Sequence, residues 1–243
     1  MALVRFVLRS VVEILVLPVT ILQYIGMWDP LYKRFFPHVM SRVTVTLNKK
    51  MGKVKKELFD KLPDFASSSG LTILEVGCGT GANFHFYPWG CKVTCVDPNP
   101  NFEGFLRQSD TENKHVKLET FIQASGEDMH QVASGSIDVV VCTLVLCSVR
   151  NIDLVLKEII RVLRPGGAFF FIEHVVAEKT GWLNFFQHVL QPAWRYFGDG
   201  CSLTKDTGTN LEKAKFSELN LKYTTERLAF NLIHDHIVGY GVK

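Results

Sequence analysis

The feature that most restricts the fold is a short apolar run leading directly into a glycine-rich turn. Residues 71–76 are the apolar run, and Gly77-Cys78-Gly79-Thr80-Gly81 follows it. A buried parallel strand has this apolar character, and glycines at its end permit positive φ and close approach of a ligand. A second apolar run, residues 91–96, ends at Asp97, 20 residues after Gly77. A carboxylate at that spacing can accept hydrogen bonds from a ribose. We therefore expect a nucleoside-containing ligand at this turn.

Two kinds of ligand compete for the glycine turn. The pattern Gly77-x-Gly79-x-x-Ala82 fits the loose dinucleotide fingerprint, with alanine in the third place. A dinucleotide would bring its pyrophosphate to the turn, where the carboxylate of Glu75, immediately before the turn, would repel it. The same carboxylate suits the ammonium group of a methionine moiety. Glu75 therefore favours a ligand that joins adenosine to methionine.

Four segments follow one another in an order typical of one enzyme class. They are Ile73-Leu74-Glu75-Val76-Gly77-Cys78-Gly79-Thr80-Gly81, Gly126-Glu127-Asp128-Met129, residues 137–142 and Arg161-Val162-Leu163-Arg164-Pro165-Gly166-Gly167. Together they resemble class I S-adenosylmethionine-dependent methyltransferases, which implies S-adenosyl-L-methionine as the cofactor. The resemblance implies that Asp128 accepts from the adenine amine and that Met129 packs on the adenine ring.

The predicted cofactor site combines the turn with side chains at the ends of several strands. Its residues are Glu75, Gly77, Gly79, Gly81, Asp97, Asp128, Met129 and Cys142. Each piece taken alone has a simpler interpretation. A glycine-rich turn is also a common strand–helix connection, Asp97 before a proline could begin a turn, and Asp128 could be a solvated loop acid.

The remaining periodicity predicts the fold class, an α/β protein with a Rossmann-like open sheet. Residues 153–163 carry the apolar face of a helix that covers a sheet, and residues 168–172 are the next buried strand. A helix over 211–216 and two strands, 219–225 and 233–242, close the domain. The sheet should be mostly parallel, with an antiparallel C-terminal edge and helices on both faces. Ligands bind such sheets at the carboxyl ends of the strands.

Residues 1–28 are predicted to be a hydrophobic membrane anchor. They are almost wholly apolar, and residues 14–28 carry no charge. A cleaved signal peptide is an alternative, but no small-residue cleavage site follows the apolar stretch. A straight span needs about 20 apolar residues, whereas this uncharged run is shorter and contains Pro18. A bent, re-entrant or interfacial helix fits better.

Positive charge is concentrated directly after that segment. Residues 29–61 carry nine Lys/Arg against three Asp/Glu, whereas residues 62–243 carry 16 against 20. We interpret residues 29–61 as a basic juxtamembrane and cap helix region that faces anionic headgroups, although an ordinary solvated helix would have similar charges. Residues 62–243 are the predicted cofactor-binding domain. Its acidic balance argues against a nucleic-acid partner, as does the lack of Asn/Asp-Pro-Pro-Tyr after the fourth strand.

The sequence gives fewer indications of the part of the site that would bind the methyl acceptor. Residues 178–197 carry an apolar stripe at helical spacing, which suits either a sheet cover or a lid over an acceptor pocket. His174, at the end of the fifth strand, and Asp199 are the candidate catalytic bases, although His174 could also be a structural histidine. None of the six cysteines forms a CxxC pair or a zinc-finger spacing with a histidine, so no metal is predicted.

Longer strings narrow the class to a family. They are LEVGCGTGANFHFYPWGCKVTCVDPNP, GEDMHQVASGSIDVVVCTLVLCSV and WRYFGDGCSLT, beside the apolar N-terminus and the basic region. Over nearly the whole length the chain resembles the methyltransferase-like protein 7 family, nearest its A-type branch. That resemblance implies methyl transfer to small or lipophilic thiols. It also implies the endoplasmic reticulum membrane and lipid droplets as location, with the catalytic domain in the cytosol. Trp89 and Gly208 depart from the family pattern.

Two other functions remain open from the sequence. One is a methyltransferase that acts on an oxygen or carbon of a lipid or quinone. The other is a lipid-droplet protein that keeps the fold without turnover.

Overall fold

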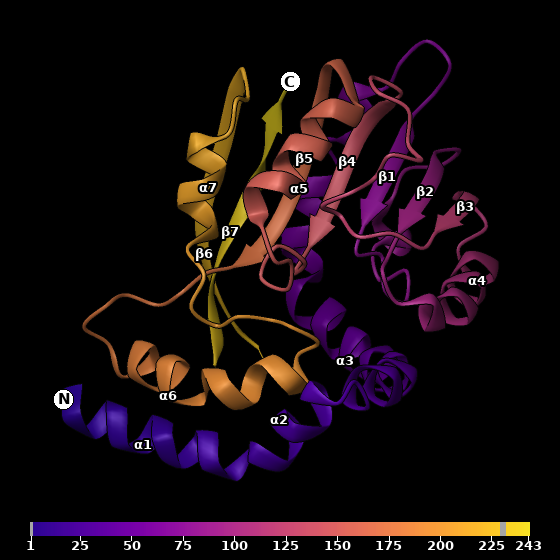
Figure 1. Ribbon diagram of the computed structural model, residues 1–243. Helices are drawn as coiled ribbons and strands as arrows, with labels where there is room; N and C mark the ends of the chain where they lie inside the picture. Colours follow the sequence, from indigo (N-terminus) through magenta and orange to yellow (C-terminus); the bar gives the residue numbers. More distant parts are fainter. Residues whose placement is uncertain (1, 229–231) are drawn as a thin grey trace.

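The computed structural model describes residues 2–228 and 232–243, and its centre is a seven-stranded sheet (Figure 1). The strands lie in the order β3-β2-β1-β4-β5-β7-β6. Their bounds are β1 (Thr72–Val76), β2 (Lys92–Val96), β3 (Lys117–Ile122), β4 (Ile137–Thr143), β5 (Leu163–His174), β6 (Glu218–Leu228) and β7 (Ile233–Val242). Strands β1 to β5 pair in parallel, whereas β7 pairs antiparallel with β5 and β6. The predicted sheet architecture is confirmed.

Helices accompany the sheet and extend beyond it at the N-terminus. Their bounds are α1 (Ala2–Leu15), α2 (Leu17–Tyr24), α3 (Trp28–Phe59), α4 (Glu103–Glu112), α5 (Ile152–Val162), α6 (Trp182–Phe197) and α7 (Thr207–Lys213). Short 3-10 helices lie at Leu62–Phe65, Phe84–Phe86 and Pro100–Phe102. Helix α5 begins where the Asn151 side chain accepts from the Leu154 N–H at 3.2 Å, as an N-cap should.

Two apolar clusters lie on opposite faces of the sheet, because successive strand residues point to opposite sides. On one face Ile73 and Val139 pack with the C-terminal part of α3, including Phe59. On the other face Leu74 and Val140 pack with α5. The sheet is therefore buried on both faces, as its nearly continuous apolar strands predict.

The structure corrects the sequence prediction at four elements. The strand expected over 168–172 is longer, because β5 spans Leu163–His174. Strand β3 was not predicted, because it lies at the edge of the sheet and is largely exposed. The helix expected over 211–216 begins at Thr207, because Asp206 Oδ1 accepts from the Thr209 N–H and caps it, and it ends at Lys213. Gly208 lies in its first turn and does not interrupt it. Strand β6 is longer than predicted, reaching Leu228.

The N-terminal helices lie apart from the sheet. Helix α1 runs alongside α6, and α2 leads into the long helix α3 (Figure 1). None of the residues of α1 and α2 is buried. Within residues 2–228 and 232–243, no helix has both the length and the apolar character needed to cross a bilayer. The division into residues 1–28, 29–61 and 62–243 stays a prediction, and α3 accounts for most of the middle segment.

Candidate active site

A cavity of about 1290 Å³ lies beside the glycine turn. Its walls come from α3, the ends of β1, β2, β4 and β5, and the segment from the end of α6 to Lys205. In the sheet order, β1 lies between β2 and β4, so the chain crosses from one half of the sheet to the other at this point. Open α/β sheets bind ligands at such a switch point.

The glycine turn lines the cavity mainly through its first four residues. Gly77 has φ +66° and its N–H donates to the Val96 carbonyl at 2.7 Å. A Cβ at Gly77 would lie 2.5 Å from a methyl carbon of Val145, so only glycine fits there. Gly79 also lines the cavity, with φ +51°. Gly81 does not line it, because it faces α4 and would place a Cβ 2.9 Å from Ser109 Cβ.

Asp97 lies where the sequence predicts, at the end of β2 and in the cavity wall. Its Oδ2 accepts from the Gly79 N–H at 3.1 Å, and its Oδ1 accepts from the Asn99 N–H at 2.9 Å. The side chain is buried. Burial raises the pKa of Asp97 to about 6, although the two backbone N–H groups oppose that rise. The carboxylate therefore holds the glycine turn in place while facing the cavity.

Glu75 is the second buried carboxylate of the cavity. Its oxygens accept from Asn83 Nδ2 at 2.9 Å and from the Tyr87 hydroxyl at 2.8 Å. Burial raises the pKa of Glu75 to about 7, opposed by these two donors and by the nearby charge of Lys55. Glu75 is thus poised to ionise when a cation arrives in the cavity.

Lys55 was placed by the sequence analysis in a headgroup-facing basic region, and the structure corrects this. The side chain is fully buried and lines the cavity. Its Nζ donates to Asn48 Oδ1 at 2.7 Å and lies 5.5 Å from the Phe86 ring centroid. Burial lowers the pKa of Lys55 to about 8, opposed by Glu75. A lysine among other lysines carries no sequence signal for burial, so only the packing of α3 reveals it.

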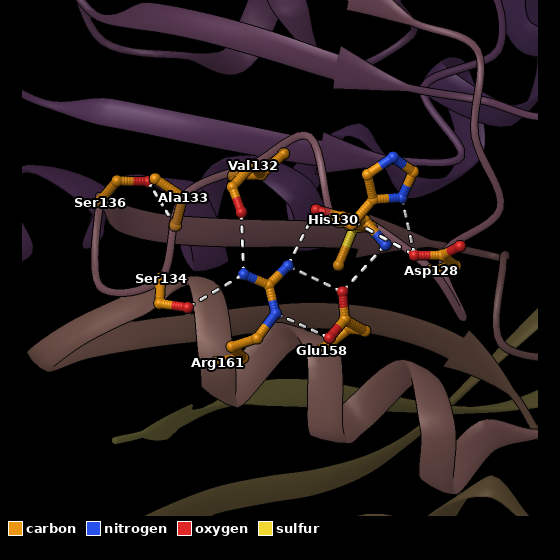
Figure 2. A network of polar contacts seen from close by, with 9 residues as sticks. Asp128, His130, Val132, Ala133, Ser134, Ser136, Glu158 and Arg161 are labelled. Atoms are coloured by element: carbon orange, nitrogen blue, oxygen red, sulfur yellow. Dashed lines mark hydrogen bonds and ion pairs between the residues drawn. The ribbon is translucent and has the colours of Figure 1, made fainter.

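Asp128 and Met129, which were predicted to contact the adenine, are not among the residues that line the cavity. Asp128 is exposed, and its Oδ1 pairs with His130 Nδ1 at 3.0 Å (Figure 2). Met129 is fully buried in the core beneath α5. Their segment is tied to α5, because Glu158 accepts from the Met129 N–H and Arg161 donates to the Met129 carbonyl.

Glu127, one position earlier, does line the cavity. Its Oε1 accepts from the Asn151 N–H at 3.1 Å, which joins the segment after β3 to the start of α5. Glu127 lies in a turn over residues 125–128, where the Asp128 N–H donates to the Ser125 carbonyl at 3.0 Å.

Cys142 is also absent from the cavity lining. It lies on β4 in the same core cluster as Met129 and is fully buried. Strand alternation turns its side chain towards α5, and the next residue, Thr143, lines the cavity instead. Thr143 Oγ1 accepts from Asn83 Nδ2 at 3.1 Å, which links the end of β4 to the Glu75 network.

Both predicted bases line the cavity, but their surroundings differ. Burial raises the pKa of Asp199, opposed by Lys33 and assisted by Asp29. Asp199 also has φ +47°, a left-handed conformation that is strained for a residue with a Cβ. His174 is buried at the end of β5, and its Nε2 lies 3.1 Å from Cys201 Sγ.

The structure brings together three groups that the sequence analysis treated separately. Cys147 follows β4, His174 ends β5 and Cys201 follows α6, and each offers an atom within 4.8 Å of the others. All three are buried and line the cavity. Their separation along the chain gives no motif, so only the fold reveals this cluster.

Helix α6 has two surfaces with different roles. Phe185 and Val189 are buried, so this side of α6 packs against the protein interior. Trp194 and Phe197, near its C-terminus, line the cavity. The C-terminal part of α6 thus contributes to the cavity wall, while its roles as a sheet cover and as a lid over an acceptor pocket stay predictions.

Comparisons with known proteins identify the class of protein to which this fold belongs. A family model described as a methyltransferase domain matches residues 74–171. A solved SAM-dependent methyltransferase from Thermotoga maritima superposes with a TM-score of 0.60 at 16% identity, covering 88% of this chain and 99% of that one. The chain therefore has the Rossmann-like α/β fold of methyltransferases.

Two curated relatives identify the family. Thiol S-methyltransferase TMT1A of Homo sapiens is 54% identical over 100% of both chains. Thiol S-methyltransferase TMT1B of Homo sapiens is 48% identical over 97% of both chains. The chain belongs to the methyltransferase family that includes these two relatives. This confirms the family resemblance drawn from its sequence.

Proposed function

We propose that this protein transfers a methyl group from S-adenosyl-L-methionine to the sulfur of small or lipophilic thiols. One observation carries the proposal: Glu75, Asp97 and the glycine turn line a single cavity that His174 also lines. The names of the 54% and 48% identical relatives support a thiol as the acceptor.

The chain's own groups would divide the work of binding. Asp97 would accept from the ribose hydroxyls, and Glu75 would hold the ammonium group of the methionine moiety. Glu127 takes the place that the sequence analysis gave to Asp128 near the adenine. S-adenosyl-L-methionine supplies a methyl group already activated on a sulfonium, so the protein mainly has to align the acceptor with that methyl.

The acceptor must also lose a proton. A thiol with a pKa near 8.5 is only a few per cent thiolate at neutral pH, so a base or a positive field would accelerate transfer. His174 and Asp199 stay the predicted bases. A largely apolar pocket favours the reaction, because thiolate and sulfonium lose their charges together in the transition state.

We expect cofactor affinity to increase with pH between about 5.5 and about 8, because Glu75 (pKa about 7) and Asp97 (pKa about 6) lose their protons across that range. The cationic ammonium binds the ionised form of Glu75 more tightly than the protonated form. Calorimetric titration with the demethylated cofactor at several pH values measures this. Glu75→Gln should remove the part of the rise near pH 7, and an unchanged profile in that variant would exclude Glu75 as its cause.

The acceptor class can be tested with competing substrates. The full-length protein is given methyl-labelled cofactor with an aliphatic thiol and a phenol of similar size. We expect label on sulfur only. Exclusive O- or C-methylation would favour the lipid or quinone enzyme. Cofactor binding without transfer to any acceptor would favour a non-catalytic protein that has kept the fold.

We further propose that α1 and α2 lie in the headgroup region of a membrane or lipid-droplet surface, on the cytosolic side of the endoplasmic reticulum. Large apolar side chains of these helices are exposed, among them Leu3, Phe6, Ile14, Leu15 and Ile21. Arg5 and Arg9 lie among them and can reach anionic headgroups.

Charged substitutions on this surface should release the protein from membranes. We expect Phe6→Glu with Ile14→Glu to weaken binding to anionic vesicles at least about 100-fold, since burying each side chain contributes about 1.5–3 kcal/mol. Co-sedimentation with the vesicles measures the loss. Trp89→Glu is the matched control, because Trp89 is 87% exposed but lies in the loop before β2. Equal loss in both variants would contradict the assignment.

A further inference from the structure

We propose that Cys147, His174 and Cys201 bind one Zn²⁺ ion whose fourth position, open to the cavity, takes the acceptor sulfur as a thiolate. This deepens the proposed function, on which the role of the fourth position rests. It assigns His174 as a ligand in place of a base.

The donor set is the first argument. Two thiol sulfurs and one imidazole nitrogen lie within 4.8 Å of one another, and His174 Nε2 is 3.1 Å from Cys201 Sγ. In a tetrahedral site with Zn–S of about 2.3 Å and Zn–N of about 2.0 Å, the sulfur and nitrogen ligand atoms of this set are about 3.5–3.8 Å apart. Small side-chain movements would therefore place all three around one ion.

The surroundings are the second argument. The three side chains are nearly or fully excluded from solvent, at 1% exposed for Cys147 and His174 and 7% for Cys201. His174 Nδ1 is buried and has no hydrogen-bond partner among the described residues. The ion would bind at His174 Nε2, which faces Cys201 Sγ at 3.1 Å, so Nδ1 would carry the ring proton.

The position and charge of Lys205 are the third argument. Lys205 Nζ donates to the carbonyls of Leu146, at 3.3 Å, and Val149, which flank Cys147 on either side. Two thiolates and a neutral imidazole balance the charge of Zn²⁺. A third thiolate, from the acceptor, would leave one negative charge, which the Lys205 ammonium offsets.

Three protein ligands with one open position are the arrangement of catalytic zinc sites, including Cys₂His sets. A thiol bound to such an ion is deprotonated. The acceptor thiol would thus release its proton to water on binding. Its sulfur would then form a bond to the methyl carbon while the bond from that carbon to the cofactor sulfur breaks. The electron pair of the broken bond stays on the cofactor sulfur, and both products are neutral thioethers.

The test begins with metal binding, measured apart from activity. Full-length protein is stripped with a chelator and titrated with Zn²⁺ against a chromophoric competitor. We expect one Zn²⁺ per chain, and a loss of more than about 100-fold in affinity for Cys147→Ser, Cys201→Ser and His174→Gln, beyond the usual effect of an outer-shell change. Cys91→Ala is the control, because Cys91 is buried immediately before β2 and is not part of the cluster. Calorimetry with the demethylated cofactor verifies that each variant is folded.

Cobalt reports the coordination itself. Co²⁺ in the same site should show the visible bands of a tetrahedral ion and a thiolate-to-cobalt charge-transfer band, which should intensify when an aliphatic thiol is added. Absence of Zn²⁺ binding in the wild type, retention of binding in the three variants, or no response of the cobalt bands to the thiol would overturn the proposal. Thiol methylation that continues unchanged after zinc removal would also overturn it and leave the proposed function standing. Zinc binding without thiol methylation would refute the function but not the metal site.

Discussion

Replacing Asp97 by alanine is expected to weaken binding of the cofactor by about 2–4 kcal/mol, or roughly 30- to 1000-fold. The carboxylate is predicted to accept two ribose hydrogen bonds. It also accepts from the Gly79 N–H, so its loss would release the turn that approaches the ligand. Calorimetry with the demethylated cofactor measures the change directly.

Asp128→Ala is the matched control for this experiment. Both residues are aspartates predicted from the sequence to contact the cofactor, but Asp128 is exposed and paired with His130 outside the cavity. We expect the Asp128 variant to bind the cofactor within a factor of about two of the wild type, because surface changes are usually within about 0.5 kcal/mol. A large loss in Asp128→Ala with none in Asp97→Ala would reverse our assignment.

Gly77→Ala should be the most damaging substitution in the turn. A left-handed conformation at a residue with a Cβ costs about 1–2 kcal/mol, and forcing a methyl against the Val145 side chain adds about 1–3 kcal/mol. We therefore expect the free energy of unfolding to fall by about 2–5 kcal/mol. Urea titration followed by circular dichroism measures it.

Two further variants separate the conformational effect from the steric one. Gly90 has φ +76°, and a Cβ there would meet nothing within 4 Å, so Gly90→Ala carries only the conformational penalty, about 1–2 kcal/mol. Adding Val145→Ala to Gly77→Ala should recover part of the loss, because it removes the methyl groups that lie 2.5 and 2.7 Å from the new carbon. If Gly77→Ala is no worse than Gly90→Ala, contact with Val145 is not the cause.

Local sequence patterns were sufficient to predict features that depend on a single strand or turn. The apolar runs that became β1, β2, β4 and β5, the glycine turn and Asp97 at the end of β2 could all be predicted. Burial of a strand and positive φ at a turn depend on residues adjacent in the chain. Strand β3 escaped prediction because an exposed edge strand lacks that apolar signal.

Side-chain direction was predicted less well. Met129 and Cys142 belong to the correct segments, but the structure turns them into the core, and Glu127 and Thr143 face the cavity. A motif predicts the segment that approaches a ligand. A shift of one residue in a turn or strand reverses the direction in which a side chain points. That direction depends on tertiary contacts, such as those of Glu158 and Arg161 with the Met129 backbone.

By itself, the sequence determined the central strands of the sheet, the glycine turn and the family of this protein, because these depend on local residue patterns. Only the tertiary structure decided that Lys55 is buried beside Glu75, and that Cys147, His174 and Cys201 meet at one wall. The reason is physical: these contacts join α3, β1, β5 and the segments after β4 and α6, which are distant in sequence, and they form only when the helices pack on the completed sheet.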